Sequence, residues 1–372
     1  MKKFQIPVAN AFVGKEEANE VYSVVKSGWI SMGKKVEEFE NSFSKYVDSK
    51  HSIAVNNGTS ALHIALIAMG IKDGDEVLVP DITYITTSNV VLYERATPIL
   101  VECDPDTYNI SLEDAEKRIT NKTKAIIPVD MNGLPVDYDN VLAFAKKHNL
   151  KVIADSAESL GCSYKGKRNG AIAPIHMFSF FPNKAITTGE GGMITTNNDQ
   201  LADELRKLRN HGQSYRYNHI MLGYNYRMPD VLAAIGIQQL KKINYITSKK
   251  EEIANTYTNS FNGHKLIKPP YLPDYATNHS WYMYPITLDK NIDRDLVVKK
   301  LKEKGIDTRL SFPPIHIQPY YMERFNFKED SYPVSLAAWK SLIDLPVGVD
   351  LTPEEQKYVI DSLLQIVDEV AN

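Results

Sequence analysis

The sequence predicts an α/β fold, in which a mostly parallel sheet is covered by helices and is followed by a smaller α+β domain. Between residues 51 and 155, short apolar strands alternate with helical segments over short connections, a pattern typical of parallel sheets. From about residue 263 the alternation ends, and a Pro- and aromatic-rich region leads to a few separate strands and helices. With 372 residues, 43% of them hydrophobic, the chain is long enough for two cores. We therefore predict a large domain at 1–245 and a small domain at 246–372.

The elements of the large domain follow from the spacing of apolar residues. Two helices are expected first, at 15–27 and about 34–48, and the turn between them places Trp29 among glycines, either as a packed turn or as a lid over a ligand. Strands are expected at 51–55, 76–79, 97–103, 124–129, 151–155, 175–181 and 193–196. Helices are expected from Thr59 onward and at 84–94, 112–119, 137–148 and 199–210.

The C-terminal third is predicted to hold a different set of elements. Pro229 indicates the start of a long helix at 231–243, and a more polar helical stretch at 246–262 is interpreted as a hinge into the small domain. The small domain itself is then expected to contain strands at 285–288 and 308–312 and helices at 294–304 and 353–370.

Composition argues against several classes of function. A formal net charge of -3 and a pI of about 6.3 give no electrostatic basis for binding nucleic acid or an anionic membrane. Cys103 and Cys162 lie far apart and predict neither a disulfide framework nor a metal site. Since the N-terminus lacks a signal sequence and no apolar run approaches a membrane span, we expect a cytoplasmic protein.

Polar residues follow the predicted strands, where parallel sheets bind their ligands. One such segment is Asn57-Gly58-Thr59-Ser60, a strand end, a glycine turn and hydroxyl residues at a helix start. This arrangement presents backbone N–H groups to an anion, although an ordinary N-cap has the same pattern. Asp81 to Tyr84, Asp130 and the segment from Asp155 to Glu158 occupy equivalent positions.

Asp155 and Lys184 indicate a cofactor. Asp155 closes an apolar strand, so its carboxylate needs a cationic partner, either a protonated pyridine nitrogen or an arginine. Lys184 lies between an aromatic strand end and a Gly-rich turn, where desolvation is expected to lower the pKa of its amine and suit it to a Schiff base with an aldehyde cofactor. The alternative is a surface lysine in a hairpin. Tyr84 could stack on a flat ring or be a core aromatic.

Six segments taken together resemble the sugar aminotransferases of the DegT/DnrJ/EryC1/StrS family. They follow the family's order and spacing across essentially the whole chain: Gly28-Trp29-Ile30-Ser31, Asn57-Gly58-Thr59-Ser60-Ala61-Leu62, Thr83-Tyr84, Asp155-x-Ala157-Glu158, Ser179-Phe180-x-x-x-Lys184-x-x-Thr187-Thr188-Gly189-Glu190-Gly191-Gly192 and Gly223-Tyr224-Asn225-Tyr226-Arg227-Met228. The resemblance implies the aspartate aminotransferase fold (fold type I) of pyridoxal-5′-phosphate (PLP) enzymes, whose large domain holds a mostly parallel, mixed seven-stranded sheet.

The resemblance also implies a role for individual residues. Lys184 matches the catalytic Schiff-base lysine, which later moves a proton between substrate and cofactor, and Asp155 matches the partner of the pyridinium nitrogen. Tyr84 matches the residue stacked on the ring, and Glu158 lies near the phenolic oxygen, where the family more often has Gln. The phosphate is expected to be bound by Gly58, Thr59, Ser60 and Ser179 of one chain and by Asn225 of the other chain of a homodimer with shared active sites.

The activity implied is transamination, because a related branch of dehydratases carries His where this chain has Lys184. L-Glutamate is the family's usual donor, and pyridoxamine 5′-phosphate carries its amine to a keto group of a nucleotide-linked sugar. The pattern is most similar to GDP-perosamine synthases, which act on GDP-4-keto-6-deoxy-D-mannose in O-antigen biosynthesis. A UDP- or dTDP-linked 4-keto or 3-keto sugar stays open as an alternative, with a PLP-dependent sugar dehydratase less favoured.

Three residues are expected on the sugar-nucleotide side: Trp29, Arg309 and His316. Charge complementarity to a diphosphate favours Arg309, while Arg309 in a structural ion pair and His316 as a buried structural histidine are the alternatives. The chain departs from the family at Asp130, which stands where the family has a His-containing strand end. A contact of Asp130 with substrate or with the second subunit would weaken the substrate assignment and leave the cofactor assignment intact.

Overall fold

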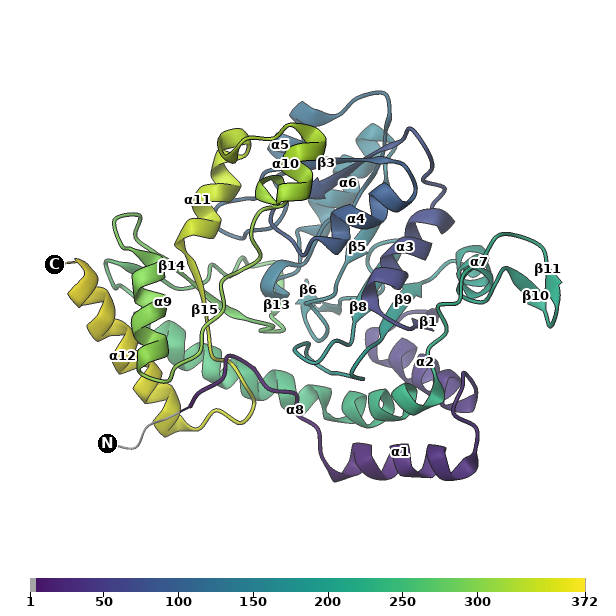
Figure 1. The fold of residues 1–372 in the computed structure, drawn as a ribbon, viewed down its shortest axis with the longest axis horizontal. Coiled ribbons are helices and arrows are strands. Elements are labelled where there is room, and N and C mark those ends of the chain that lie inside the picture. Colours follow the sequence, from purple (N-terminus) through teal and green to yellow (C-terminus); the bar gives the residue numbers. More distant parts are fainter. Residues whose placement is uncertain (1–4, 372) are drawn as a thin grey trace.

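A seven-stranded sheet forms the centre of the large half of the molecule, as seen in the computed structural model, which describes residues 5–371 (Figure 1). Its strand order is β1-β9-β8-β5-β4-β2-β3. Only β9 runs antiparallel to its neighbours, and the pairs from β8 to β3 are parallel. The strands are β1 (His51–Val55), β2 (Glu76–Pro80), β3 (Thr97–Val101), β4 (Thr123–Ile126), β5 (Lys151–Asp155), β8 (Ile175–Ser179) and β9 (Gly192–Thr196). The predicted mixed, mostly parallel sheet is confirmed.

Successive side chains of each strand enter different cores, so both faces of the sheet are buried. In β5, Ile153 packs in the core that contains α3, whereas Val152 and Ala154 pack in the core that contains α6. The helices of this half are α1 (Lys15–Ser27), α2 (Lys34–Val47), α3 (Gly58–Ala68), α4 (Thr86–Tyr93), α5 (Leu112–Arg118), α6 (Tyr138–His148) and α7 (Asp199–Arg209). Ligands are therefore admitted at the carboxyl edge of the strands and not at the faces.

Helix α8 (Asp230–Phe261) is one continuous helix of 32 residues, where the sequence suggested two helical stretches and a hinge. Asn244 and Tyr245 continue the helix because neither glycine nor proline interrupts this stretch. Ile243 and Ile246 pack in the core with α2, and Tyr257 and Phe261 pack in the core of the C-terminal half. The predicted division at 245/246 thus falls inside α8 and stays a prediction.

The C-terminal half is built on a three-stranded antiparallel sheet of order β12-β14-β15. Its strands are β12 (Ile267–Lys268), β14 (Tyr284–Leu288) and β15 (Leu342–Leu345), and its helices are α9 (Arg294–Glu303), α10 (Pro319–Phe325), α11 (Pro333–Ser341) and α12 (Pro353–Ala371). Ile6 also packs in this core and forms an isolated β-bridge to Ile306, so the start of the described chain contacts the C-terminal half.

The predicted strand at 308–312 is wrong, because only an isolated bridge between Arg309 and Asp344 forms there. Pro313 and Pro314 follow, and proline cannot donate to a strand ladder. Several short elements were also missed: β6 (Ser163–Tyr164), β7 (Lys167–Arg168), β13 (Ala276–Asn278), and the hairpin of β10 (Gln213–Tyr215) and β11 (Asn218–His219), which extends from the body in Figure 1. None of the helices within residues 5–371 is long and apolar enough to cross a bilayer.

Candidate active site

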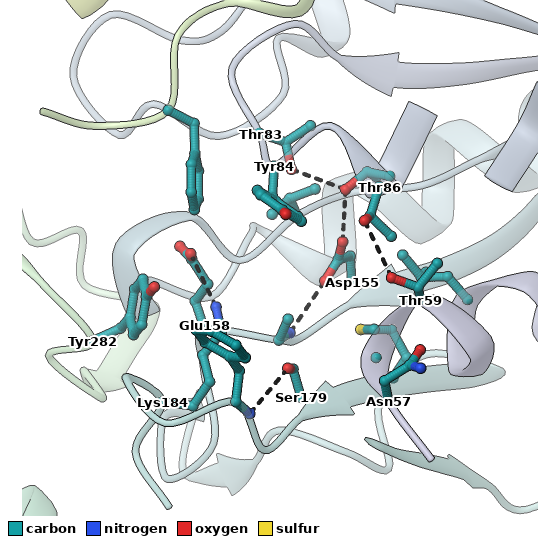
Figure 2. Close-up of a pocket in the computed structure, with 18 of the residues that line it drawn as sticks. Asn57, Thr59, Thr83, Tyr84, Thr86, Asp155, Glu158, Ser179, Lys184 and Tyr282 are labelled. Atoms are coloured by element: carbon teal, nitrogen blue, oxygen red, sulfur yellow. Dashed lines mark hydrogen bonds and ion pairs between the residues drawn. The ribbon is translucent and has the colours of Figure 1, made fainter. Parts of the chain in front are cut away.

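A cavity of about 430 Å³ opens at the carboxyl edge of the seven-stranded sheet. Its lining comes from the segments after β1, β2, β5 and β8 and from the C-terminal half. In Figure 2, Tyr282, Glu158 and Lys184 lie on one side, Asn57 and Thr59 lie on the other, and Asp155 lies between them. The edge expected to bind ligand therefore carries a cavity lined by side chains from both halves of the chain.

Asp155 lies at the end of β5 and is only 5% exposed. Its carboxylate accepts hydrogen bonds from the Thr87 hydroxyl (2.8 Å) and the Ala157 N–H (3.2 Å), and within residues 5–371 it forms no ion pair. Burial raises the pKa of Asp155 to about 6, against the opposing effects of these two donors and of the Lys184 charge. A cation bound in the cavity would restore the charged form of this carboxylate.

Lys184 follows β8 and directs its amine into the cavity, where Nζ lies 3.5 Å from Glu158 Oε1 and 4.1 Å from the centre of the Tyr282 ring. We expected burial to lower the pKa of this amine. Burial does act in that direction, but Tyr282 and the carboxylates of Glu158 and Asp155 outweigh it, and the pKa of Lys184 is raised. The expected direction is corrected, because the sequence did not reveal the negative groups that surround the amine.

Glu158 is held on both of its carboxylate oxygens. Oε2 accepts the backbone N–H of Asn132 at 2.8 Å, while Oε1 faces Lys184. The side chain is almost fully buried, and Ser280 Oγ donates to the backbone carbonyl of Glu158 at 2.7 Å. Glu158 is thus a fixed carboxylate beside the lysine amine.

The start of α3 forms a cradle for an anion. A Cβ atom at Gly58 would approach Ser179 Cβ to 3.1 Å and Met177 Cε to 3.2 Å, so the absence of a side chain leaves space against the helix end. Asn57 Oδ1 caps the helix by accepting the Ser60 N–H at 2.8 Å, and Ser60 itself is buried outside the cavity lining. The N-cap and the anion cradle therefore coexist, because the cap uses only one of the free N–H groups of the first turn.

The rim comes partly from the C-terminal half. Arg309 Nη1 donates to the Tyr282 hydroxyl at 2.8 Å, and the guanidinium lies 4.6 Å from the centre of the Phe312 ring. Tyr84 is 58% exposed at the cavity, with its ring 5.4 Å from that of Phe312. Lys250, on α8, donates from Nζ to the Trp281 carbonyl at 3.1 Å and so tethers the residue next to Tyr282.

Besides Ser60, three more predicted residues lie outside this cavity. Trp29 is 63% exposed in the turn between α1 and α2, and Asn225 is exposed in the segment before α8. His316 has a fully buried side chain, whose Nδ1 bonds Asp81 at 2.6 Å and whose Nε2 bonds the Glu329 carbonyl at 2.9 Å. Nε2 donates to the Glu329 carbonyl, and Nδ1 shares a hydrogen bond with the Asp81 carboxyl. His316 therefore lies in a buried structural contact and not on the sugar side, where we expected it.

Two cavity residues were missed by the sequence analysis. Thr87 donates to Asp155, and Tyr282 lies against the Lys184 amine. Thr87 follows a strand end and could have been included with Tyr84. Tyr282 carried no local signal, because only the tertiary fold brings the Pro- and aromatic-rich region to the sheet edge.

The residues present fit PLP. A buried amine can form the covalent link, a buried carboxylate without a cationic partner can hold the pyridinium nitrogen, and the space over Gly58 suits the phosphate. The fold and the site together define a PLP-dependent enzyme.

Comparisons with known proteins give the family. The model of the DegT/DnrJ/EryC1/StrS aminotransferase family matches residues 12–364, and the chain belongs to this family. It is 40% identical to the GDP-perosamine synthase of Caulobacter vibrioides over 98% of both chains, and 39% identical to that of Escherichia coli O157:H7 over 96% of this chain and 97% of the relative.

The fold comparison agrees. Spr1654 from Streptococcus pneumoniae, solved in PMP and PLP forms, aligns with TM-scores of 0.94 and 0.93 at 29% identity, covering 99% of this chain and 98% and 100% of the solved chains. The protein is therefore a sugar aminotransferase that uses PLP, with a nucleotide sugar and an amino donor as substrates.

Proposed function

We propose that this enzyme transfers the amino group of L-glutamate to the C4 keto group of GDP-4-keto-6-deoxy-D-mannose, giving GDP-perosamine for O-antigen or another surface polysaccharide. The observation that carries the proposal is the 40% identity to a GDP-perosamine synthase over nearly the full length of both chains. Other members of the family act on other sugars, so a UDP- or dTDP-linked keto sugar is the alternative that the experiment below must distinguish.

PLP, when bound, supplies the electron sink for both half-reactions. Asp155 would hold the ring nitrogen protonated, because its burial makes a cationic partner favourable. Lys184 would hold the cofactor covalently and, once released, would move a proton with its Nζ atom. Glu158 and Tyr282 hold that amine from two sides, at 3.5 Å from the carboxylate and 4.1 Å from the ring centre. The presence of Lys184 argues against the dehydratase alternative.

The phosphate would be bound by the first turn of α3 together with Thr59 and Ser179, which line the cavity. Arg309, at the rim, would bind the diphosphate of the sugar nucleotide, because a guanidinium forms paired hydrogen bonds with phosphate oxygens. Tyr84, exposed at the cavity, would stack on the ring.

We also propose that two copies of the chain share each site, with Asn225 binding the phosphate of the partner. Exposed apolar side chains near this residue support a contact with a second copy: Tyr215, Tyr217, Ile220 and Leu222 are each more than half exposed. Such a cluster is typical of an interaction surface.

The first test is an absorbance titration of the purified protein with PLP. We expect a visible band of covalently bound cofactor that glutamate bleaches and GDP-4-keto-6-deoxymannose restores, with Lys184→Ala as the control that shows no such band. If only a UDP- or dTDP-linked sugar restores the band, the aminotransferase assignment stands and the perosamine assignment fails. Folded wild-type protein that forms no covalent link with PLP would contradict the role of Lys184.

A mixing experiment tests the shared site. Lys184→Ala and Asn225→Asp should each be inactive, the second because a carboxylate would face the phosphate. If sites are shared in a twofold dimer, each mixed dimer holds one intact site, and random mixing should restore roughly a quarter of wild-type activity. If Lys184 and Asn225 serve the same chain's site, mixing restores nothing.

A further inference from the structure

Asp130 is a carboxylate buried away from the cavity and surrounded by hydrogen-bond donors. It is 1% exposed, and five groups donate to it without any ion pair within residues 5–371. They are the Val136 N–H (2.9 Å) and the side chains of Tyr138 (2.9 Å), Ser156 (2.8 Å), Ser159 (2.7 Å) and Asn169. A buried carboxylate is stable without a cation only when donors satisfy its oxygens in this way.

Two of these donors connect Asp130 to the cavity. Ser156 directly follows Asp155, and Ser159 directly follows Glu158. The main chain adds a second link, because the Asp130 N–H donates to the Asp155 carbonyl at 3.1 Å. The turn that carries both cavity carboxylates is therefore bonded to Asp130 at its two ends.

A third link runs through the 3-10 helix that starts after Asp130, η1 (Met131–Gly133). Asn132 has a positive φ of 58°, in the left-handed region, and in this conformation its N–H reaches Glu158 Oε2 at 2.8 Å. Asp130 thus holds the residue after Glu158 through the Ser159 hydroxyl. It also lies two residues before Asn132, whose N–H donates to the Glu158 carboxylate.

The direction of the hydrogen bonds around Asp130 is also determined. His176 Nε2 accepts the Ala173 N–H at 2.8 Å, and burial lowers the pKa of His176 to about 3, so the ring is neutral. Its proton therefore lies on Nδ1, which donates to Ser156 Oγ at 3.0 Å. The Ser156 hydroxyl in turn donates to Asp130. The groups around residue 130 therefore all donate hydrogen bonds, and they suit a side chain that only accepts them. Asp130 is such a side chain, at the position where the family has a His-containing strand end.

We propose that Asp130 is a positioning residue, which holds Asp155 and Glu158 in register with the cofactor ring and with Lys184 through the hydroxyls of Ser156 and Ser159. This inference rests on the proposed function. The sequence left open whether Asp130 contacts the substrate or a second subunit. Asp130 is buried away from both the cavity and the protein surface, so a direct contact with either is not expected.

The test compares wild type with Asp130→Asn, in which an NH2 group would meet the converging donors. A misplacement on the order of 1 Å at the reacting groups costs up to ~10²-fold in rate, so we expect PLP affinity and the glutamate half-reaction to fall by ~10- to 100-fold. We also expect the midpoint of the pH titration of the visible cofactor band to move, because that midpoint reports the charges around Lys184. A purely structural role would lower the melting temperature and leave that midpoint unchanged, and such a result would overturn the proposal.

A pair of hydroxyl deletions covers the case in which Asp130→Asn does not fold. Ser159→Ala removes a donor that belongs to the turn, whereas Tyr138→Phe removes a donor on α6 that does not. The titration midpoint should move in Ser159→Ala and stay in Tyr138→Phe, and equal behaviour of the two variants would contradict the proposal. A wild-type protein without the visible band would instead contradict the proposed function, so the two failures are distinguishable.

Discussion

Asp155 ends β5 and Asp130 comes after β4, the neighbouring parallel strand of the same sheet, and both residues are almost fully buried. Asp155 accepts two hydrogen bonds and faces a cavity, whereas Asp130 accepts from five groups and faces only protein. Burial alone does not distinguish a carboxylate that binds a ligand from one that organises the fold. A carboxylate with few donors beside an open cavity marks the first, and a carboxylate surrounded by protein donors marks the second.

Asp155→Asn should give the largest contrast between the two regions. Loss of the charge removes the partner of the pyridinium nitrogen. Breaking a buried charge pair costs ~3–5 kcal/mol, so the glutamate half-reaction should fall by ~10²–10⁴-fold. The PLP-free protein should keep or gain stability. The pKa of Asp155 is raised to about 6 in the folded protein. The PLP-free wild type therefore loses ~3 kcal/mol of its free energy of unfolding as the pH rises from about 4 through 6. The variant has no carboxyl group at this position and does not show this loss.

Melting curves of the PLP-free wild type and variant at pH 4.5 and pH 8, values chosen on either side of the pKa of about 6, measure this prediction. The comparison breaks if the PLP-free variant is less stable than wild type at the higher pH, because Asp155 would then be as structurally satisfied as Asp130.

His176→Gln should affect the Asp130 region and leave the charge of Asp155 unchanged. With its pKa lowered to about 3 by burial, His176 stays neutral in the fold but takes up a proton in the unfolded chain below about pH 6.5. Stability is therefore lost as pH falls below 6.5, by ~2 kcal/mol at pH 5. Urea unfolding measures the free energy of unfolding at pH 7 and at pH 5. The difference between these two values should be smaller in the variant than in wild type by about this amount. An equal difference in both proteins would contradict the neutral ring of His176.

Thr87→Val should give the smallest effect, on the Asp155 side. It removes one of the two donors that hold the Asp155 carboxylate, a hydrogen bond worth ~1.5 kcal/mol for a charged acceptor, so PLP affinity should fall by ~10-fold. Thr87→Ser is the matched control, because it keeps the hydroxyl that bonds Asp155 and removes only the methyl group. Equilibrium binding of PLP to both variants measures the difference, and equal losses would show that Thr87 acts only by packing.

Much of the large half follows from local pattern. Strands buried on both faces, such as 175–179, are mostly apolar. The residues that end two of them, Asp155 and Ser179, lie at the cavity as the edge rule predicts. Gly58 and Lys184 also line the cavity, where the resemblance to the family placed them.

The remaining features depend on contacts between distant segments. The strand predicted at 308–312 is one example. Only an isolated bridge between Arg309 and Asp344 forms there, and the apolar pattern of the segment does not distinguish such a bridge from a strand. The raised pKa of Lys184 depends on Tyr282, almost one hundred residues away in the sequence. A buried structural role for His316 was one of the two expectations, but its partner Asp81 was not predicted. Local sequence predicts which residues end a strand, but it does not predict which groups surround them.

The continuity of α8 has a mechanical consequence. A helix of 32 residues spans about 48 Å. In Figure 1, α8 runs along the lower side of both halves of the molecule as one continuous helix. Lys250 of α8 bonds the Trp281 carbonyl beside Tyr282, and Gln239 of the same helix accepts the N–H of Thr187, three residues after Lys184. The two walls of the cavity are therefore both attached to α8. A movement of the C-terminal half that changed the distance between Tyr282 and Lys184 would therefore have to bend α8. We therefore expect the gap between these walls to be set when the chain folds, and access for a large sugar nucleotide to depend on the loops at the rim.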